Sequence, residues 1–581
     1  MRLPILPEIS LSRDFIETFG GYNHNERIGE NEFYDMKNLT SDKYPLLSPR
    51  SKRGTYAEPE NPQGLIAKDA LCYIDGTKFV INDNHIDLEL SVRDEDCPKQ
   101  LISMGAYVII LPDKKYINTA NLNDYGNIEA SFNSQGTVSF EMCDINGNAY
   151  DNVITSSSAP VDPTNNTLWL DNSATPNTLK QFSETSGIWV SIATTYIKIS
   201  APQIGKPFEN GDGVKISGVE DERLADLNNT MVIWKCEEDY IVVIGIISGK
   251  LTQDLPIQIE RTMPQMDFII ENNNRLWGCK YGVSNEGEFV NELYACKLGD
   301  FKNWNCFVGV STDSYRVSLG TDGQFTGAIT HKGYPVFFKE NCLHKVYGNY
   351  PSNFGVQTTA CSGVQKGSSK SLAIVNELLY YKSRTGICVY DGALPSEISS
   401  VLGNELYSNA IAVAHRNKYY ISMLNKNNEF DMFVFDTVKG LWHKEDNTEI
   451  YAWCSVDDEL FFIDGKDRKI KSIYGTGEPT EDDINWLAET GIIGASTPNK
   501  KYLSQLMVRI ALEIGSRVSF YVQYDSCGDW IHLSTLTGNS LKTFNASVRP
   551  QRCDHLKLRI LGKGDAKIYS ISKVFEQGSV Y

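Results

Sequence analysis

The sequence predicts an all-β protein built on a β-propeller of six to seven blades, with an inserted β-domain and a C-terminal β-sandwich. The main observation is a recurring unit in which an Ala-led apolar stretch runs through a short polar turn into an aromatic pair. Four copies begin at Ala328, Ala373, Ala412 and Ala452, which lie 45, 39 and 40 residues apart. A strand-rich unit that repeats near 40 residues indicates propeller blades, because a blade of four short strands has about that length.

The composition agrees with β structure. The 581 residues include 30 Tyr, 24 Phe and 45 Gly, which are frequent in strands and tight turns. No apolar run reaches the roughly 18 residues that a membrane-spanning helix needs. The segment from Met1 to Pro7 lacks the apolar stretch of a signal peptide, so we expect the chain to fold in a cytoplasm.

The cysteines and the net charge exclude several classes of protein. Thirteen Cys are scattered with no C-x-x-C pair, which argues against a disulfide framework and against a structural zinc site. Cys72, Cys279, Cys388 and Cys454 lie in apolar stretches and are predicted to be buried free thiols. The net charge of −18 disfavours tight nucleic-acid binding, which needs clustered Lys and Arg.

Changes in pattern along the chain divide it into six segments. Pro and Gly favour an extended start, and an Asn-, Ser- and Thr-rich stretch interrupts the repeat as an insertion at a loop tip would. Short alternating strands near the C-terminus indicate a sandwich. The predicted segments are an N-terminal strap (1–60), the first blades (61–119), one or two inserted β-domains (120–262), the remaining blades (263–476), an acidic linker (477–500) and the sandwich (501–581).

The number of blades depends on how the first units are counted. Seven units are present, or six blades if the first two units share one blade. They begin near residues 65, 102, 269, 328, 373, 412 and 452. The best short helical candidate lies outside them, at residues 483–489.

A search for metal and nucleophile motifs finds none. The eight His are dispersed, without H-E-x-x-H or another close ligand pair, and are expected to be solvated in turns. G-x-S-x-G, the P-loop and G-x-G-x-x-G are missing. The stretch from Asp144 resembles a calcium loop but has Ala149 and Thr155 where an EF-hand needs Gly and Glu. A hairpin turn at Asn146-Gly147 explains it better.

Acidic and aromatic residues offer two further candidates. Glycoside hydrolases use paired carboxylates, and acidic residues cluster at 457–459 and at Asp436, Glu445 and Asp446. We predict that these clusters are solvated turns. Trp442 is either an aromatic ligand platform or a wedge between blades, and the wedge is preferred. The sequence therefore names no catalytic, cofactor-binding or metal-ligating residue and no cofactor, and it predicts that the chain is not an enzyme.

Four motifs in the strap carry a family resemblance. They resemble the start of virion structural proteins encoded in phages and prophages of Gram-positive gut bacteria. The order of strap, blades, inserted domain and further blades also resembles the tail nozzle (tail tubular protein B type) of short-tailed phages. The motifs are Phe19 to Asn23, Gly29 to Phe33, Asn38-Leu39 and Tyr44 to Arg50.

The resemblance implies a structural component of a bacteriophage virion. It implies a ring of six copies in the tail nozzle, hub or head-to-tail connector, docked on the portal, the adaptor or other tail proteins and assembled in the host cytoplasm. DNA would leave through the lumen without specific binding, and a charge of −18 on each copy would keep the lumen from trapping it. The alternative is a tail-associated carbohydrate-binding or glycan-cleaving receptor-binding protein, with host surface glycans as ligand. A generic scaffold for protein partners is a third hypothesis.

Overall fold

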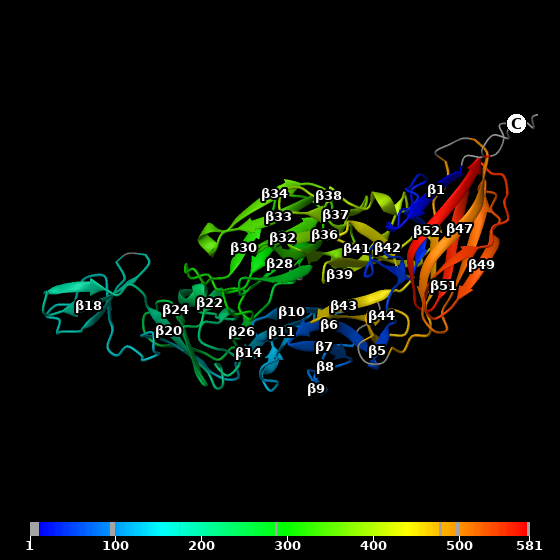
Figure 1. The fold of residues 1–581 in the computed structure, drawn as a ribbon. Helices are drawn as coiled ribbons and strands as arrows, with labels where there is room; N and C mark the ends of the chain where they lie inside the picture. Colours follow the sequence, from blue (N-terminus) through cyan, green and yellow to red (C-terminus); the bar gives the residue numbers. More distant parts are fainter. Residues whose placement is uncertain are drawn as a thin grey trace, which may run out of the picture.

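The computed structural model describes residues 11–92, 99–173, 175–284, 287–475, 479–495 and 499–577. Within them the regular secondary structure consists of β-strands and four short 3-10 helices, which confirms the predicted all-β propeller class. The molecule is elongated, with a sandwich at one end, the propeller in the middle and an inserted lobe at the other end (Figure 1). No helix in the described ranges is both long and apolar enough to cross a membrane.

Six blades of the propeller are four-stranded antiparallel sheets that are continuous in sequence. Blade 1 is β6 (Pro62–Lys68), β7 (Ala70–Asp75), β8 (Lys78–Ile81) and β9 (Asn84–Asp87); blade 2 is β10 (Gln100–Met104), β11 (Tyr107–Leu111), β12 (Lys115–Asn118) and β13 (Tyr125–Asn127); blade 3 is β27 (Phe268–Asn272), β28 (Arg275–Val283), β29 (Phe289–Ala295) and β30 (Tyr315–Ser318). Blade 4 is β31 (Phe325–His331), β32 (Tyr334–Lys339), β33 (Cys342–Tyr347) and β34 (Gly355–Ala360); blade 5 is β35 (Ala373–Val375), β36 (Leu378–Lys382), β37 (Ile387–Tyr390) and β38 (Ser396–Glu397); blade 6 is β39 (Ser408–His415), β40 (Lys418–Leu424), β41 (Phe430–Asp436) and β42 (Leu441–Lys444).

The seventh blade joins the two ends of the propeller. Its first three strands are β43 (Ile450–Val456), β44 (Glu459–Asp464) and β45 (Ile470–Ser472), and its outer strand is β5 (Gly54–Ala57), which comes from the strap. The inner strand β43 also contacts β6 of blade 1. The ring of blades is therefore closed, and the strap covers the outer edge of the last blade.

The repeat seen in the sequence has a direct structural cause. Consecutive residues of a strand point to opposite faces of a sheet, yet both members of the pairs Phe337-Phe338 and Tyr419-Tyr420 are buried. Both faces of the second strand are therefore covered by neighbouring blades; for example, the ring of Phe338 in blade 4 lies 5.1 Å from that of Tyr381 in blade 5. The Ala of each unit lies on the innermost strand, where the blades converge and side chains must be small.

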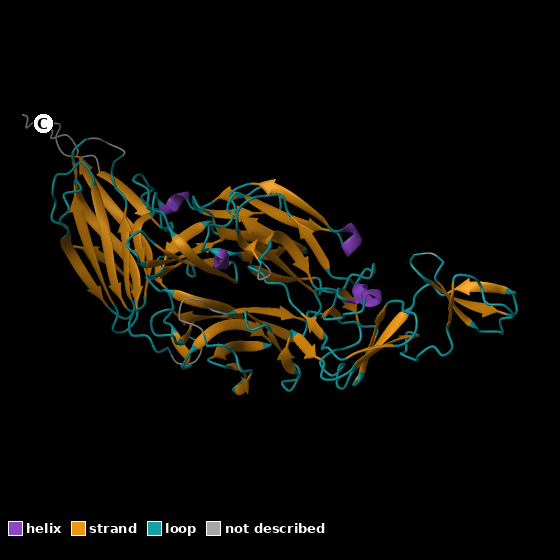
Figure 2. Cartoon of the chain, turned by 180° about the vertical axis from the view of Figure 1, so that it is seen from behind, coloured by secondary structure: helices purple, strands orange, loops and turns teal. Residues whose placement is uncertain are grey.

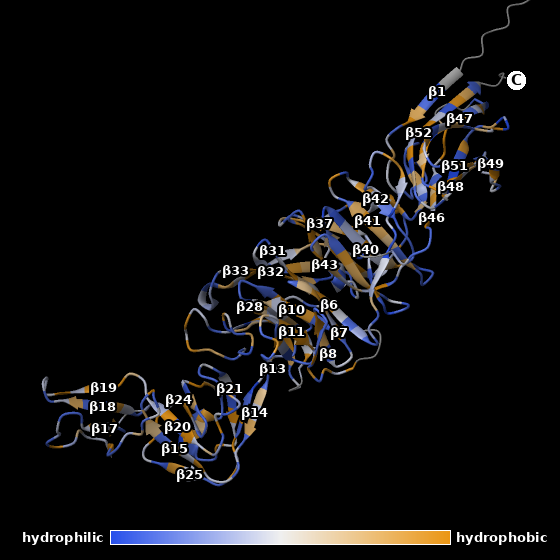
Figure 3. Cartoon of the chain, turned by 60° about the horizontal axis from the view of Figure 1, so that its bottom comes forward, coloured by the Kyte–Doolittle hydropathy of each residue, from blue (hydrophilic) through white to orange (hydrophobic). Residues whose placement is uncertain are grey.

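The inserted lobe lies between β13 and β27 and has a core of its own. Its start is later than the predicted residue 120, because β13 still pairs with β12 in blade 2. Two sheets lie near the propeller, and a small third sheet lies at the far tip (Figure 3). The three sheets are β14 (Ala130–Asn133), β26 (Gln258–Arg261), β21 (Gly213–Ser217) and β22 (Thr230–Val232); β23 (Lys235–Glu237), β24 (Tyr240–Ile244), β20 (Tyr196–Ser200), β15 (Val138–Cys143) and β25 (Leu251–Gln253); and β16 (Ile154–Ser156), β17 (Leu168–Asp171), β18 (Thr178–Ser183) and β19 (Ile188–Ser191).

The C-terminal sandwich has two sheets, and each takes one strand from the strap. The first sheet is β1 (Leu11–Ile16), β52 (Ala566–Gln577), β47 (Lys501–Leu512) and β50 (Leu541–Ala546); the second is β2 (Phe33–Lys37), β46 (Asn485–Thr490), β51 (Leu556–Lys563), β48 (Arg517–Tyr524) and β49 (Ile531–Thr537). The predicted linker over 477–500 and helix over 483–489 were therefore wrong where the structure describes them. Trp486 and Ala488 alternate with less buried neighbours at strand period and form β46.

The strap lies between the sandwich and the propeller (Figure 1), where loops and short strands join these two parts of the molecule (Figure 2). The Tyr22 N–H donates to the Trp442 carbonyl of blade 6 at 2.5 Å, and the Asn38 N–H donates to the Glu445 carbonyl in the loop that follows this blade. On the other side, Leu47 exchanges backbone hydrogen bonds with Ile568 of β52. One hydrophobic cluster accordingly runs from the sandwich through the strap into blade 6.

Two arginines of the strap are held in a buried ionic cluster. Arg50 binds both oxygens of Glu481 at 2.8 Å and lies 3.4 Å from Asp446. Arg53 lies 3.2 Å from Glu445 and 2.9 Å from Asp446. The prediction that Asp436, Glu445 and Asp446 lie in solvated turns was wrong. The strap covers Glu445 and Asp446, and Ser41 of the strap donates to the buried Asp436 at 2.6 Å. Residues 457 and 458 are exposed, as expected.

Four of the histidines are buried, contrary to the expectation that the histidines are solvated: His331, His344, His415 and His443. Burial lowers the pKa of His344 from 6.5 to about 4 and that of His443 from 6.5 to about 3. The unfolded chain therefore takes up these protons before the folded chain does when the pH falls below 6.5. We expect the free energy of unfolding to fall between pH 6.5 and pH 4, by about 1.4 kcal/mol per pH unit for each of these two side chains.

Urea unfolding at pH 7.5, 6.5, 5.5 and 4.5 measures this slope. His344→Asn is expected to reduce the slope of the free energy of unfolding against pH by about 1.4 kcal/mol per pH unit, which corresponds to one proton fewer taken up on unfolding. This holds even if the substitution also lowers stability at every pH. His85→Gln is the control, because His85 is exposed on the outer strand β9. Equal slopes of unfolding free energy against pH in the wild type and in His344→Asn would contradict the lowered pKa of His344.

Candidate functional site

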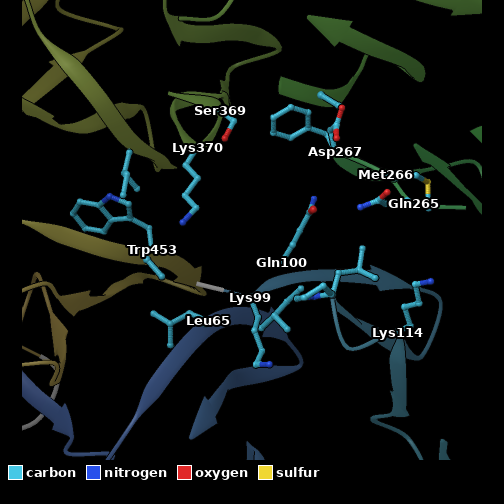
Figure 4. A pocket seen from close by; sticks show the side chains of 18 of the residues that line it. Leu65, Lys99, Gln100, Lys114, Gln265, Met266, Asp267, Ser369, Lys370 and Trp453 are labelled. Carbon is cyan, nitrogen blue, oxygen red and sulfur yellow. The ribbon is translucent and has the colours of Figure 1, made fainter. Parts of the chain in front are cut away.

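A cavity of about 580 Å³ lies on the axis of the propeller, and we call it the axial cavity (Figure 4). Its wall is made by residues of the innermost strands β6, β10, β27, β31, β39 and β43 and of the helix η3 (Ser369–Ser371). Ala328, Ala412 and Ala452 of the repeat belong to this wall. The small side chains of the repeat are therefore what leaves the axis open.

Polar side chains reach the axial cavity from several blades. Gln100 donates to the Ile269 carbonyl at 2.7 Å, which fixes its amide against blade 3. Asp267 accepts from Lys280 at 2.8 Å and from the Tyr281 N–H at 2.9 Å. Gln265 and Lys370 are exposed side chains of the wall, with Gln265 beside Met266 and Lys370 beside Ser369 (Figure 4). The wall thus offers amide and ammonium groups.

Trp453 supplies an aromatic surface on β43. Its ring packs against Phe462, with ring centres 5.4 Å apart, and against Tyr420 at 6.3 Å. The indole N–H is buried, and within the described residues it has no hydrogen-bond acceptor. A buried donor without an acceptor costs about 1–3 kcal/mol, so a bound group that accepts from Trp453 would recover that energy.

Lys99 and Lys114 at the same wall are already paired. Lys99 is fully buried and binds Asp113, and Lys114 binds Glu129 at 2.6 Å. Burial alone would raise the pKa of Asp113, but the hydrogen bonds from Lys99 and Ser91 outweigh it and lower that pKa. We therefore assign the Lys99–Asp113 pair to structure, as a link between the loops beside β10 and β11.

A second cavity of about 240 Å³ lies between blades 3 and 4, and we call it the interblade cavity. Two of its wall residues carry buried polar atoms that lack partners in the described chain, namely Asn272 Oδ1 and Trp277 Nε1. Phe354 stands edge-to-face against Trp277, with ring centres 4.9 Å apart. Arg275 lies beside them, but its guanidinium is occupied by the carbonyls of Cys296, Asp313 and Ser311.

Neither cavity contains the carboxylate pair of a glycoside hydrolase. Asp267 is the single carboxylate in the described wall of the axial cavity, and the described wall of the interblade cavity holds none. Paired carboxylates about 5–10 Å apart are what acid–base cleavage of a glycosidic bond requires. The described walls of the two cavities carry aromatic faces, amides and buried hydrogen-bonding atoms without partners.

The other residues considered from the sequence lie outside both cavities. Trp442 donates from Nε1 to the Ile398 carbonyl of the blade 5–6 connection at 3.1 Å and packs at a tilt against Phe435, with ring centres 4.9 Å apart, so it is a wedge between blades. Asp144 accepts from the N–H groups of Asn146 and Asn148, which closes a turn. Cys72, Cys279, Cys388 and Cys454 are buried free thiols, as predicted. No group of three potential metal ligands occurs in the described ranges.

The residues that the sequence did not identify are Trp453, Trp277 and Asn272. Each belongs to the repeat, where its position on a strand suggested packing alone. The signal that sets them apart is an unpaired polar atom, and only the folded structure contains it. A weak sequence signal exists for Trp453, because it replaces the aliphatic residue that follows Ala in the other units.

No protein-family model matches this chain, and the search of curated proteins found no match. Solved structures do match, at low similarity. An exo-β-1,3-galactanase from Phanerochaete chrysosporium has 9% identity, covers 52% of this chain and 94% of its own, and has a TM-score of 0.20. PorZ of the type-IX secretion system of Porphyromonas gingivalis has 11% identity, with 88% and 77% covered and a TM-score of 0.25. A Trypanosoma rangeli sialidase has 9% identity, with 91% and 96% covered and a TM-score of 0.18.

These matches correct one expectation. The conclusion that the chain is not an enzyme does not stand, because the solved structures that it resembles include a galactanase, other glycoside hydrolases and a sialidase. At these scores no residue of their active sites is transferred to this chain.

Proposed function

We propose that this chain is a glycan-binding protein and that the propeller carries its binding sites. The proposal rests on one observation: Trp453 in the axial cavity and Trp277 in the interblade cavity both have a buried indole N–H without a partner in the described chain. Carbohydrate hydroxyls donate and accept hydrogen bonds, so a sugar can supply an acceptor to each indole and a donor to Asn272 Oδ1.

The size and the composition of the cavities support the same ligand class. Small-molecule sites commonly have volumes of roughly 300–1,000 Å³ with a few placed polar groups, and the axial cavity of about 580 Å³ falls in that range. The interblade cavity of about 240 Å³ suits a single ring. The apolar C–H face of a sugar ring can pack on Trp453 or Phe354 while its hydroxyls reach the amides.

Binding of purified host cell-wall polysaccharide fragments, measured by isothermal titration calorimetry, tests this proposal. Trp453→Phe keeps the aromatic ring but removes the N–H, and we expect it to raise Kd about 5- to 20-fold. Trp453→Ala is expected to raise Kd further, because the packing surface is lost as well. The control is Trp530→Phe, since Trp530 lies in the sandwich under Arg559, 4.0 Å from the ring centre. Wild-type affinity in Trp453→Phe, or no glycan binding by the wild type, would overturn the proposal.

We further propose that the protein belongs to a phage tail, in keeping with the strap motifs. In this arrangement one end of the elongated molecule docks on the virion and the other faces outward, with the sandwich and the inserted lobe at the two ends (Figure 3). If six copies form a ring, DNA passes between the copies, since side chains narrow the propeller axis to the axial cavity. Electron microscopy of intact particles tests this placement, and a monomer in light scattering would count against a ring.

A further inference from the structure

Three reactive side chains meet at one end of the sandwich, far from both cavities. Ser526 Oγ lies 2.8 Å from His555 Nε2, and His555 Nδ1 lies 3.2 Å from Asp554 Oδ2. Ser526 follows β48 and His555 precedes β51, and these two strands pair so that Tyr524 faces Leu556. The ends of two neighbouring strands therefore bring a hydroxyl, an imidazole and a carboxylate into the order of a Ser-His-Asp triad.

The two loops are fixed to each other independently of these three side chains. The Asp525 N–H donates to the His555 carbonyl at 3.0 Å, and Asp525 Oδ1 accepts from the N–H groups of Asp554 at 2.7 Å and of His555 at 3.3 Å. Asp525 and Ser526 have φ of 48° and 51°, a left-handed conformation that is uncommon for residues other than Gly. Such strain is often found at functional sites, where the surrounding contacts maintain it.

We propose that Ser526, His555 and Asp554 form an ester-hydrolysing site. In the first step Ser526 Oγ attacks the ester carbonyl and His555 Nε2 takes the hydroxyl proton. His555 then returns this proton to the leaving alkoxide as the C–O bond of the ester breaks, which leaves an acyl-serine and a free alcohol. Water then attacks the acyl-serine with the same proton transfers, so carboxylic acid is released and Ser526 is restored. Asp554 orients the imidazole as a positioning residue.

The surroundings of the triad indicate the substrate. His555 is partly exposed and Asp554 is about half-exposed, so the site lies on an open surface. An open site suits an ester that a larger molecule presents, and with the glycan-binding function proposed above this is an O-acyl group on a sugar of a polymer.

Two measurements test the site without any glycan. Hydrolysis of p-nitrophenyl acetate gives kcat/KM, and labelling with a fluorophosphonate followed by peptide mass spectrometry locates the reactive serine. We expect the wild type to be labelled at Ser526, and Ser526→Ala and His555→Ala to lower kcat/KM at least 100-fold. The neighbouring thiol is tested with Cys527→Ser, which is expected to hydrolyse the ester as the wild type does.

Ser519→Ala is the matched control, because Ser519 lies on β48, the strand that precedes Ser526, and its hydroxyl meets the hydroxyl of Thr535 at 2.8 Å. Equal labelling of Ser519 and Ser526, or unchanged hydrolysis in Ser526→Ala with circular dichroism like the wild type, would overturn the proposal. Glycan binding by Ser526→Ala separates the two proposals. It is expected to equal that of the wild type whether or not the triad is active.

Discussion

Replacing Arg50 with Met is expected to lower the free energy of unfolding by about 3–5 kcal/mol. The guanidinium is almost fully buried and binds Glu481 through two hydrogen bonds, with Glu445 and Asp446 also in contact. The substitution keeps most of the side-chain volume but leaves buried carboxylates with one cation fewer. Urea denaturation at pH 7.5 measures the loss of stability. The midpoint of unfolding is expected to move to a lower urea concentration, while the ring of blades remains formed in the folded state.

Lys52→Met is the matched control for this experiment. Lys52 lies two residues further along the strap and pairs with Asp483 at 2.8 Å, but both side chains are 40% exposed or more. Exposed ion pairs contribute about 0–1 kcal/mol. If Lys52→Met and Arg50→Met lowered stability equally, burial of the ionic cluster could not be the reason for its strength.

Replacing Gly21 with Ala is expected to lower the free energy of unfolding by about 3 kcal/mol and to loosen the strap. A Cβ at this position would lie 2.3 Å from the carbonyl oxygen of Trp442 and 3.0 Å from its nitrogen. Both are backbone atoms of β42, so neither can rotate away. The strap would have to move, and the hydrogen bond from the Tyr22 N–H to the same carbonyl would be strained.

Urea denaturation gives the stability, and hydrogen exchange of the amides of residues 19–23 reports on the strap itself. Gly355→Ala is the control, because a Cβ there meets nothing within 4 Å and the φ is an ordinary one. Slow exchange at Tyr22 in Gly21→Ala, together with wild-type stability, would contradict the close packing of the strap on blade 6.

The propeller could be predicted from the sequence because its signal is local. Each aromatic pair, such as Phe337-Phe338, is buried by the same arrangement of blades, so the pattern recurs in the four units that make blades 4 to 7. The closure by β5 could not be predicted in this way. Its partners are residues 470–472, and a four-residue strand so distant in sequence leaves no periodic pattern.

The acidic residues and the candidate site show a second limit of prediction from the sequence. Glu445 and Asp446 have the composition of a surface turn, and only Arg50 and Arg53, nearly 400 residues away, make their burial possible. Trp453 has the same sequence context as a packing residue, and what distinguishes it is the missing acceptor for its N–H. The residues near Glu445 and Asp446 in the sequence do not show that Arg50 and Arg53 will pair with them. Likewise, the residues near Trp453 do not show that its indole N–H will lack a hydrogen-bond acceptor.

The pairing of the strap also sets an order for synthesis on the ribosome. β1, β2 and β5 emerge first, yet their partners β52, β46 and β45 are among the last strands to be made. At roughly 5–20 residues per second, β5 waits about 20–80 s for β45. During this time the blades form an open arc with unpaired edges, which is the stage at which aggregation threatens. The inserted lobe pairs only within itself and can fold long before the ring closes.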